Sequence, residues 1–307
     1  MRILLTGSSG WLGAALAPLL AALGHEVTGL DPIPAAQTRI VGSIADRDLV
    51  MRVVQQNGIE AIIHSGALHK PNIEHHGNSD FIETNVLGTL NLLDAATAFG
   101  VQRFIFTSTT SLMISQAIRD GFTGGARKAA WLTEEMSPEP RNIYGVTKLS
   151  AEHLCRLYNL QFGLPVVILR TARFFPEADD MAHAIAQSDA NTKANELLFR
   201  RLTVEDAAEA HVAALEKAPR LGFDTFIICA PTPFQSDDCV ALITDAPSVV
   251  ARYFPEFPGL YARKGWTMFS SIDRVYDASR AKDRLGFVCK TSFADVLATL
   301  SAEQGRA

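Results

Sequence analysis

Residues 1–13 of this 307-residue chain read MRILLTGSSGWLG, and this stretch decides the fold class. The first five residues are typical of a short buried strand, and the turn after them leads into an apolar helix expected to end near Leu23. Gly7, Gly10 and Gly13 let the backbone approach a ligand closely, and the N–H groups of a helix N-terminus attract a phosphate. Their spacing differs from the common G-x-G-x-x-G pattern, so the turn alone also fits an ordinary strand-to-helix connection.

The next strand and the acid at its end favour a dinucleotide ligand. Residues 26–30 (EVTGL) are predicted as a second strand, and Asp31 follows them directly. Strand, glycine turn, helix, strand and acid, in this order, predict a dinucleotide-binding unit. The Asp31 carboxylate can accept hydrogen bonds from ribose hydroxyls and repels a 2′-phosphate, and no basic residue follows it before Arg39. We therefore expect NAD as the cofactor.

Composition and charge narrow the partners. The chain is 48% hydrophobic with a net charge of -5, so we expect a full core and no nucleic-acid partner. No charged segment followed by an apolar one stands behind Met1, and the apolar runs have the length of core elements. These features predict a cytoplasmic protein with no membrane partner.

Predicted strands and helices alternate through the first two thirds of the chain. Helices are expected from Asp46 to about Gln56, from Asn78 or Ser79 to near Gly100, from Asn142 to about Phe162 and over 204–217, with strands over 61–64, 103–107, 165–170 and 226–229. This alternation predicts an α/β fold with a doubly wound, Rossmann-type parallel sheet. The long segment from Thr110 to Pro140 lacks periodicity and is predicted as a loop over the active site.

Two groups of residues suggest acid/base chemistry. Tyr144 and Lys148 lie four residues apart on a predicted helix, so they share one face, and a nearby ammonium lowers the pKa of a phenol toward neutrality. Thr107, Thr109 and Ser111 follow a predicted strand at the sheet edge where ligands bind, and such hydroxyls can hold a reacting oxygen. The competing interpretations are a chance Tyr–Lys pair on a surface helix and hydroxyls that only satisfy turn backbone.

Seven motifs together resemble the extended short-chain dehydrogenase/reductase family, in its epimerase and dehydratase branch. They are Thr6 to Gly13, Asp31, His64-Ser65-Gly66-Ala67, Asn85-Val86-Leu87-Gly88-Thr89, Tyr144-Gly145-Val146-Thr147-Lys148, Tyr276-Asp277-Ala278-Ser279 and Leu285-Gly286-Phe287. The resemblance spans nearly the whole chain and implies a Rossmann domain with a smaller C-terminal substrate domain. We expect the first over 1–170, with about 204–230 returning to it, and the second over 171–307.

The resemblance also implies roles for individual residues. It makes Tyr144 the acid/base, places Lys148 on the cofactor ribose and has Thr109 orient the substrate. In our own hypothesis Thr109, together with Ser111, holds the reacting oxygen. It places Ser43 and Ile44 near the adenine, although the family usually has Asp where Ser43 stands. The expected cofactor contacts are Gly7, Ser9, Gly10, Trp11, Leu12, Gly13, Asp31, Ser43, Ile44, Ser65, Gly66, Ala67, Asn85, Thr107, Tyr144 and Lys148.

Departures from the family pattern narrow the substrate. Dehydratases place an Asp-Glu pair after the catalytic threonine, whereas Thr110 and Ser111 follow Thr109 here, so dehydration is disfavoured. The resembled nucleotide-sugar epimerases use an Asn and two arginines to hold a diphosphate. Arg173 takes the Asn place, with Phe199 and Trp266 where the arginines would fall, although a shifted alignment would restore Arg200, Arg201 or Arg263. A nucleotide-sugar substrate is therefore the minority expectation.

Arg173 and the histidines carry the remaining expectations. Arg173 either binds an anionic substrate group, with Arg200 and Arg201 adding charge, or pairs with acids close in sequence, Glu177, Asp179 or Asp180. His64, His69, His75 and His76 lack the spacing of a metal site, and the four cysteines lie far apart, so no metal is expected. His69 is expected to line the substrate pocket with Lys70.

These observations predict an NAD-dependent oxidoreductase that moves hydride at a secondary alcohol or ketone carbon of a small, hydroxylated, sugar-like substrate. The alternatives are a sugar or nucleotide-sugar epimerase, which oxidises its substrate transiently, and a non-catalytic dinucleotide sensor. Apolar residues beyond one narrow stripe on the helices near 79–99 and 142–162 predict a homodimer, since members of the resembled family pair these helices. They are Phe81, Val86, Leu90, Leu93, Val146, Leu149, Leu154 and Leu157.

Overall fold

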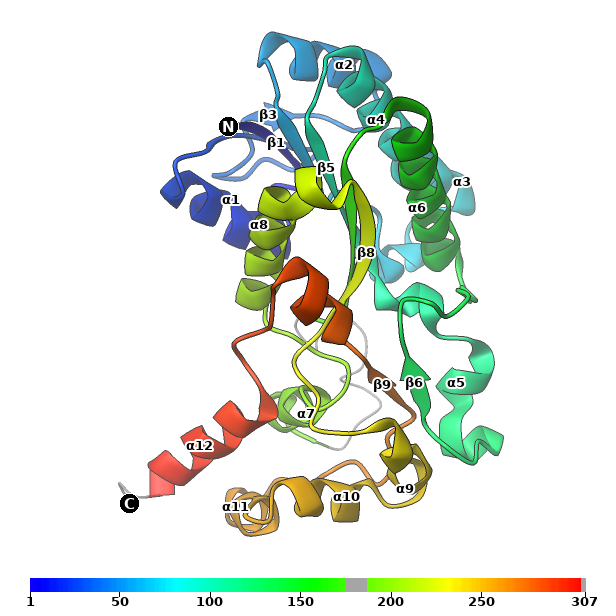
Figure 1. Cartoon of the computed structure of the whole chain (residues 1–307), viewed down its shortest axis with the longest axis vertical. Coiled ribbons are helices and arrows are strands. Elements are labelled where there is room, and N and C mark those ends of the chain that lie inside the picture. Colours follow the sequence, from blue (N-terminus) through cyan, green and yellow to red (C-terminus); the bar gives the residue numbers. More distant parts are fainter. Residues whose placement is uncertain (175–186, 305–307) are drawn as a thin grey trace.

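The structure, a computed structural model, describes residues 1–174 and 187–304, without the side chains of residues 70, 71 and 304. Its centre is a sheet of seven parallel strands in the order β3-β2-β1-β4-β5-β7-β8 (Figure 1). The strands are β1 (Arg2–Thr6), β2 (Glu26–Asp31), β3 (Ile40–Val41), β4 (Ala61–His64), β5 (Arg103–Thr109), β7 (Val166–Thr171) and β8 (Phe223–Ile228). The strand order reverses between β1 and β4, as in Rossmann folds, so the predicted fold class is confirmed.

Helices cover both faces of this sheet. Helices α1 (Trp11–Ala22) and α8 (Val204–Leu221) pack on one face, and α2 (Arg47–Gln56), α4 (Gly88–Ala98) and α6 (Ile143–Phe162) pack on the other (Figure 1). The predicted caps begin two of them. Asp46 Oδ1 accepts from Leu49 N at 2.9 Å, and Asn142 Oδ1 accepts from Gly145 N at 2.9 Å.

The helix expected from Asn78 contains a π-helical insertion. The chain runs through α3 (Asn78–Phe81), a π-helical stretch (Ile82–Leu87) and α4. The insertion carries the predicted cofactor residue Asn85, in keeping with the tendency of π-turns to occur at functional sites.

The segment from Thr110 to Pro140 is more ordered than the predicted loop. It holds 3₁₀-helical turns (Thr110–Met113, Gly121–Gly124), helix α5 (Gln116–Asp120) and strand β6 (Ala130–Leu132). β6 pairs in parallel with β9 (Arg274–Tyr276). The predicted irregular conformation is therefore wrong, because a partner strand distant in the sequence supplies backbone hydrogen bonds that local periodicity does not show. The predicted position beside the site agrees with the structure, since Ser111, Ile114 and Arg119 line the cavity described below.

The C-terminal part forms a second, smaller core beside the sheet. Its elements are α7 (Asp189–Glu196), α9 (Cys239–Thr244), α10 (Ala246–Tyr253), α11 (Phe257–Lys264) and α12 (Phe293–Gln304), with a 3₁₀ turn (Ser236–Asp238) and a π-helical stretch (Ala281–Leu285). Buried side chains such as Phe234, Tyr261 and Phe293 fill this core. These helices lie at the end of the molecule away from the first strands (Figure 1). Residues 177–180, which the sequence predicts as a loop after Arg173, lie outside the described residues.

The surface beside α4 and α6 only partly matches the predicted dimer residues. Phe81 and Leu93 are fully buried within the chain, so they serve its own core. Val146 and Leu157 are exposed, as predicted, and Leu160 adds to them on α6. Among the described residues, no helix is both long and apolar enough to cross a membrane.

Candidate active site

The glycine turn is packed too tightly for any side chain. Gly7 has φ +73°, and a Cβ there would lie 2.6 Å from the backbone N of Gly66, in the segment after β4. A Cβ at Gly13 would lie 2.3 Å from the Gly7 carbonyl oxygen. These glycines therefore bring the turn between β1 and α1 against the end of β4 and the start of α1, leaving the first turn of α1 directed toward the edge of the sheet.

The N-terminus of α1 fits a phosphate. Helices α2, α6 and α8 are capped by the side chains of Asp46, Asn142 and Thr203. Helix α1 begins after Gly10, and in the described part of the chain neither a capping side chain nor a first-turn acid serves its N–H groups. A bound phosphate would satisfy those donors and meet the positive helix end.

Asp31 lies at the end of β2 beside this turn. Its Oδ2 accepts from Ser9 N at 3.3 Å, and its Oδ1 accepts from Ile33 N at 2.9 Å. Since a carboxylate offers about four acceptor positions, Asp31 can still receive ribose hydroxyls. Gly10, Asp31 and the first turn of α1 thus fit the pyrophosphate and ribose of NAD.

Three other predicted cofactor residues, Ser43, Ile44 and Asn85, contact other parts of the chain. Ser43 Oγ accepts from Ala45 N at 3.1 Å, and Ile44 packs against Gly88, where a Cβ would lie 2.6 Å from Ile44 Cγ1. Asn85 Oδ1 accepts from Leu68 N at 2.8 Å, and its Nδ2 donates to Leu68 O at 3.0 Å. Asn85 therefore fixes the segment after β4, and its contact with a cofactor stays a prediction.

A cavity of about 430 Å³ lies at the carboxyl ends of the strands and extends from the turns that follow β1 and β4 to the ends of β5 and β7. This is the switch point where open α/β sheets bind ligands. Twelve predicted residues line it: Gly7, Gly10, Trp11, Leu12, Ser65, His69, Thr107, Thr109, Ser111, Tyr144, Lys148 and Arg173. The described lining does not include the other eight: Ser9, Gly13, Asp31, Ser43, Ile44, Gly66, Ala67 and Asn85.

Three predicted hydroxyl groups meet in the cavity wall. The Tyr144 phenol is buried and lines the same cavity as the Thr109 side chain. Thr109 Oγ1 donates to Ser111 Oγ at 3.0 Å and accepts from Ser111 N at 3.1 Å. Burial raises the pKa of Tyr144 to about 12, while the polar Thr109 side chain lowers it. The expected lowering by Lys148 is not found, because that ammonium lies over the Phe106 ring, 4.2 Å from its centroid.

Lys148 has a buried carboxylate beside it. Burial lowers the pKa of Lys148 to about 8, and the negative charge of Glu152, one turn along α6, raises it. Arg170 on β7 holds this carboxylate, with Nη2 at 2.8 Å from Oε2 and Nε at 3.1 Å from Oε1. Ser108 Oγ donates to Glu152 Oε1 at 2.5 Å. The lysine of the site thus stands against a fixed negative charge.

Two of the histidines have different surroundings. His69 lies beside Tyr144, with 5.6 Å between ring centroids, and burial lowers its pKa to about 4, so its imidazole is neutral near pH 7. His64 lies between Thr6 and Thr89, 2.8 Å and 2.9 Å from their hydroxyl oxygens, inside the sheet layer. Within residues 1–174 and 187–304, no three His, Cys, Asp or Glu side chains form a metal-binding group.

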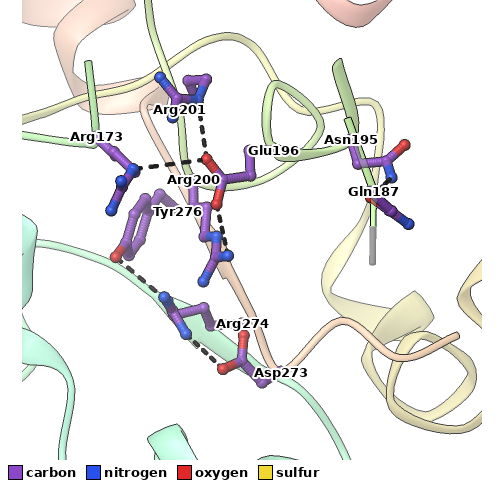
Figure 2. Close-up of polar contacts among 9 residues, drawn as sticks. All are labelled: Arg173, Gln187, Asn195, Glu196, Arg200, Arg201, Asp273, Arg274 and Tyr276. Atoms are coloured by element: carbon purple, nitrogen blue, oxygen red, sulfur yellow. Dashed lines mark hydrogen bonds and ion pairs between the residues drawn. The ribbon is translucent and has the colours of Figure 1, made fainter. Parts of the chain in front are cut away.

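Arginines surround one buried carboxylate at the far end of the site. Figure 2 shows Arg173, Arg200 and Arg201 around Glu196. Their distances to its carboxylate oxygens are 4.0 Å from Arg173 Nε, 2.6 Å from Arg200 Nη2 and 2.9 Å from Arg201 Nε. Arg173 and Arg200 line the cavity, whereas Arg201 packs behind the described lining. The acids proposed as alternative partners, residues 177, 179 and 180, lie outside the described residues.

Sequence reasoning missed three further arginines of the lining, Arg119, Arg141 and Arg274. Arg274, on β9, forms an ion pair with Asp273, and its Nε donates to the Tyr276 hydroxyl at 3.3 Å (Figure 2). Its only signal in the sequence is a position two residues before the motif that begins at Tyr276. The pairing of β6 with β9 brings it to the cavity.

Two curated proteins of known name are similar to this chain in sequence. The chain is 32% identical over 178 residues to the UDP-glucose 4-epimerase of Corynebacterium glutamicum, a match covering 55% of this chain and 50% of that protein. It is 28% identical over 183 residues to the uronate dehydrogenase of Pseudomonas syringae pv. tomato, a match covering 57% of this chain and 60% of that protein. The chain thus spans little more than half the length of these curated relatives.

A solved structure is similar to this chain in fold, and a family profile matches its sequence. The UDP-glucose 4-epimerase of Thermotoga maritima shares the fold with a TM-score of 0.70, at 21% identity over 100% of this chain and 99% of that one. Residues 3–229 match the NAD dependent epimerase/dehydratase family. Because this match covers well over half of the chain, the protein belongs to the NAD dependent epimerase/dehydratase family.

Proposed function

We propose that this protein oxidises a secondary alcohol of a small, hydroxylated, sugar-like molecule, or reduces the corresponding ketone, with NAD as the hydride carrier. The observation that carries this proposal is the meeting of Tyr144, Thr109 and Lys148 in one cavity that also reaches the glycine turn. Relatives named UDP-glucose 4-epimerase and uronate dehydrogenase support a sugar-like substrate. Thr109, His69 and Arg173 are the proposed substrate contacts.

In this mechanism Tyr144 takes the hydroxyl proton while hydride leaves the carbinol carbon, and it returns the proton in the reverse direction. Bound NAD accepts or supplies that hydride at C4 of its nicotinamide. Thr109, held by Ser111, hydrogen-bonds the reacting oxygen and fixes its approach. Because burial raises the pKa of Tyr144, its action as a base needs a positive charge beside it. Lys148 supplies this charge when its side chain turns from Phe106 toward the phenol.

The main alternative is a sugar epimerase, which returns the hydride to the opposite face of the same carbon. The likeness to proteins named UDP-glucose 4-epimerase favours it. A non-catalytic dinucleotide sensor has less support, since it has no need of Tyr144, Lys148 and Thr109 in one cavity.

A substrate screen tests these functions. Sugars, polyols, sugar acids and UDP-sugars are incubated with the enzyme and NAD, and both NADH and epimeric products are measured. NADH formation from at least one free sugar, polyol or sugar acid supports the oxidoreductase. Tightly retained NAD, an epimeric product and no net NADH identify the epimerase. NAD binding without conversion of any substrate class would contradict both enzymes and leave the sensor.

A further inference from the structure

We propose that the substrate carries an anionic group, a carboxylate or a phosphate on the sugar-like molecule itself, and that Arg200 and Arg274 bind it. This inference rests on the proposed function, because it names the substrate class of the same site. Both arginines line the cavity that holds Tyr144 and Thr109.

The two arginines are fixed at the cavity wall and largely withdrawn from water. Arg274 is 6% exposed, and the side chain of Arg200 is 13% exposed. Taking a guanidinium out of water is costly unless an anion compensates it. Arg200 lies in the loop after α7, and Arg274 lies on strand β9. The tertiary fold therefore brings them together, and the periodicity of a single helix does not.

A carboxylate behind each arginine orients it without using all of its donors. Glu196 holds Arg200 through Nη2, at 2.6 Å, and Asp273 holds Arg274 through Nη1 (Figure 2). Each guanidinium has five N–H donors in a rigid fork. Among the residues that the structure describes, the buried Nε of Arg200 has no hydrogen-bond partner. Donors therefore remain for the two oxygens of a carboxylate or the three of a phosphate.

The charge of the lining also favours an anion. Arg119, Arg141 and Arg173 line the same cavity as Arg200 and Arg274, and the described lining contains neither Asp nor Glu. Burial lowers the pKa of Arg200, Glu196 raises it, and the positive charge of Arg274 lowers it again. An anion between the two guanidiniums would relieve this repulsion.

The positions expected to hold a nucleotide diphosphate are apolar in the structure. Phe199 is buried and packs edge-on against Phe269, with ring centroids 6.2 Å apart. Trp266 packs edge-on against Tyr261, with centroids 5.4 Å apart. Arg200 and Arg274 instead line the cavity that holds Tyr144 and Thr109. We therefore assign the anionic group to the sugar-like molecule itself and not to a nucleotide diphosphate. A neighbouring hollow shares Arg119 and Arg200 with this cavity, which makes UDP-sugars the necessary competing ligands.

Binding to a variant that cannot turn over isolates this subsite from catalysis. NAD-loaded Tyr144→Phe protein is titrated calorimetrically with galacturonate, galactose 6-phosphate, neutral galactose and UDP-galactose, and with their gluco counterparts. At least one free acid or sugar phosphate should bind about 10-fold or more tightly than its neutral parent, the scale of a lost charged hydrogen bond. Adding Arg200→Gln or Arg274→Gln should remove that advantage and leave neutral-sugar binding unchanged.

Matched variants protect the result against misfolding. Arg52→Gln, an exposed arginine on α2, should change neither affinity. If a Gln variant loses its fold, judged by its Tm, then Arg200→Lys and Arg274→Lys keep a charge but not the fork, and each should lower acid binding selectively. Equal binding of acids and neutral parents, or a preference for UDP-sugars over every free acid and sugar phosphate, overturns the inference. In that case, oxidation of neutral sugars by the unmodified enzyme would still support the proposed function. Selective binding of acids or sugar phosphates, with no turnover of any tested compound by the unmodified enzyme, would refute the proposed function but not the anion-binding site.

Discussion

The carboxylate of Glu152 stands one helical turn from Lys148 on α6, and both side chains are buried. Burial lowers the pKa of Lys148, and the negative charge of Glu152 raises it. The resulting pKa of Lys148 is about 8. Since two hydrogen bonds from Arg170 fix the carboxylate, its effect on the lysine is built into the fold. Glu152 therefore controls the pH range over which Lys148 is charged.

The pH profile of Glu152→Gln tests this control. Lys148 acts as a cation, so kcat/KM should fall as pH rises through about 8 in the unmodified enzyme. Without the neighbouring negative charge the lysine loses its proton more easily, and the fall should move to lower pH by about one unit or more. Ser108→Ala removes only a hydrogen bond to the same carboxylate, so it should leave the fall near its original pH. A folded Glu152→Gln enzyme with an unshifted profile would contradict this role.

Tyr144→Phe tests the acid/base assignment. The substitution removes the proton-carrying oxygen and keeps the ring that packs beside His69. We expect kcat to fall by roughly 10² or more, the scale of one acid/base group, with NAD affinity and Tm nearly unchanged. Steady-state kinetics, fluorescence titration of NAD and thermal unfolding measure the three quantities. Normal turnover by this variant would assign the proton transfer to another residue.

Cofactor choice should depend on Asp31. NAD is expected to bind more tightly than NADP, because the carboxylate repels a 2′-phosphate. The N–H of Ile33 already donates to Asp31 at 2.9 Å, and the Ile33 side chain is exposed, so an arginine there would stand beside the ribose. Asp31→Ala combined with Ile33→Arg should narrow the gap between the two dissociation constants. Equal affinity of the unmodified protein for both cofactors would refute the assignment.

Local signals account for most of the fold that the sequence predicted. Asp46 and Asn142 cap helices that begin at the next residue, and apolar runs such as 61–64 become buried central strands. Strands β6 and β9 were not predicted. Each has only three residues, and their partners lie more than a hundred residues apart in the chain, so neither periodicity nor turn chemistry marks them.

The residues of the candidate site also divide into those with a local sequence signal and those without one. Thr109 follows a recognisable strand, and Tyr144 stands in a motif at a capped helix start, so their meeting could be predicted from sheet topology. Arg119, Arg141 and Arg274 were not predicted, because they come from three separate segments and a single arginine carries no local pattern. Lys148 shows a further limit: helical spacing places it on the face of Tyr144, but only packing shows its ammonium over Phe106.

The homodimer remains a prediction with a defined surface. Val146, Leu157 and Leu160 are exposed on α6, and their separations of 11 and 14 residues correspond to about three and four helical turns, so they share one face. We expect a dimer mass by light scattering at micromolar concentration, and Leu157→Glu should shift it toward the monomer. Val240→Glu, at an exposed position on α9, is the control and should not. A monomeric unmodified protein would contradict the prediction.

Arg173 fits two roles, an ion-pair partner of Glu196 and a substrate contact. Its Nε lies 4.0 Å from Glu196, which suits a structural ion pair, yet its side chain also lines the cavity. If it binds the substrate, Arg173→Ala should raise KM or lower kcat/KM by roughly 10-fold or more, the scale of a lost charged hydrogen bond.

Arg201→Lys separates these roles. Arg201 holds the same Glu196 at 2.9 Å but packs behind the described lining, so its replacement disturbs the ion-pair cluster without removing a cavity charge. We expect this variant to lower Tm with little change in KM, whereas Arg173→Ala should change KM more than Tm. If Arg173→Ala instead lowers Tm with unchanged kinetics on the best substrate, Arg173 is a structural partner of Glu196. Substrate binding would then depend on the other arginines of the cavity.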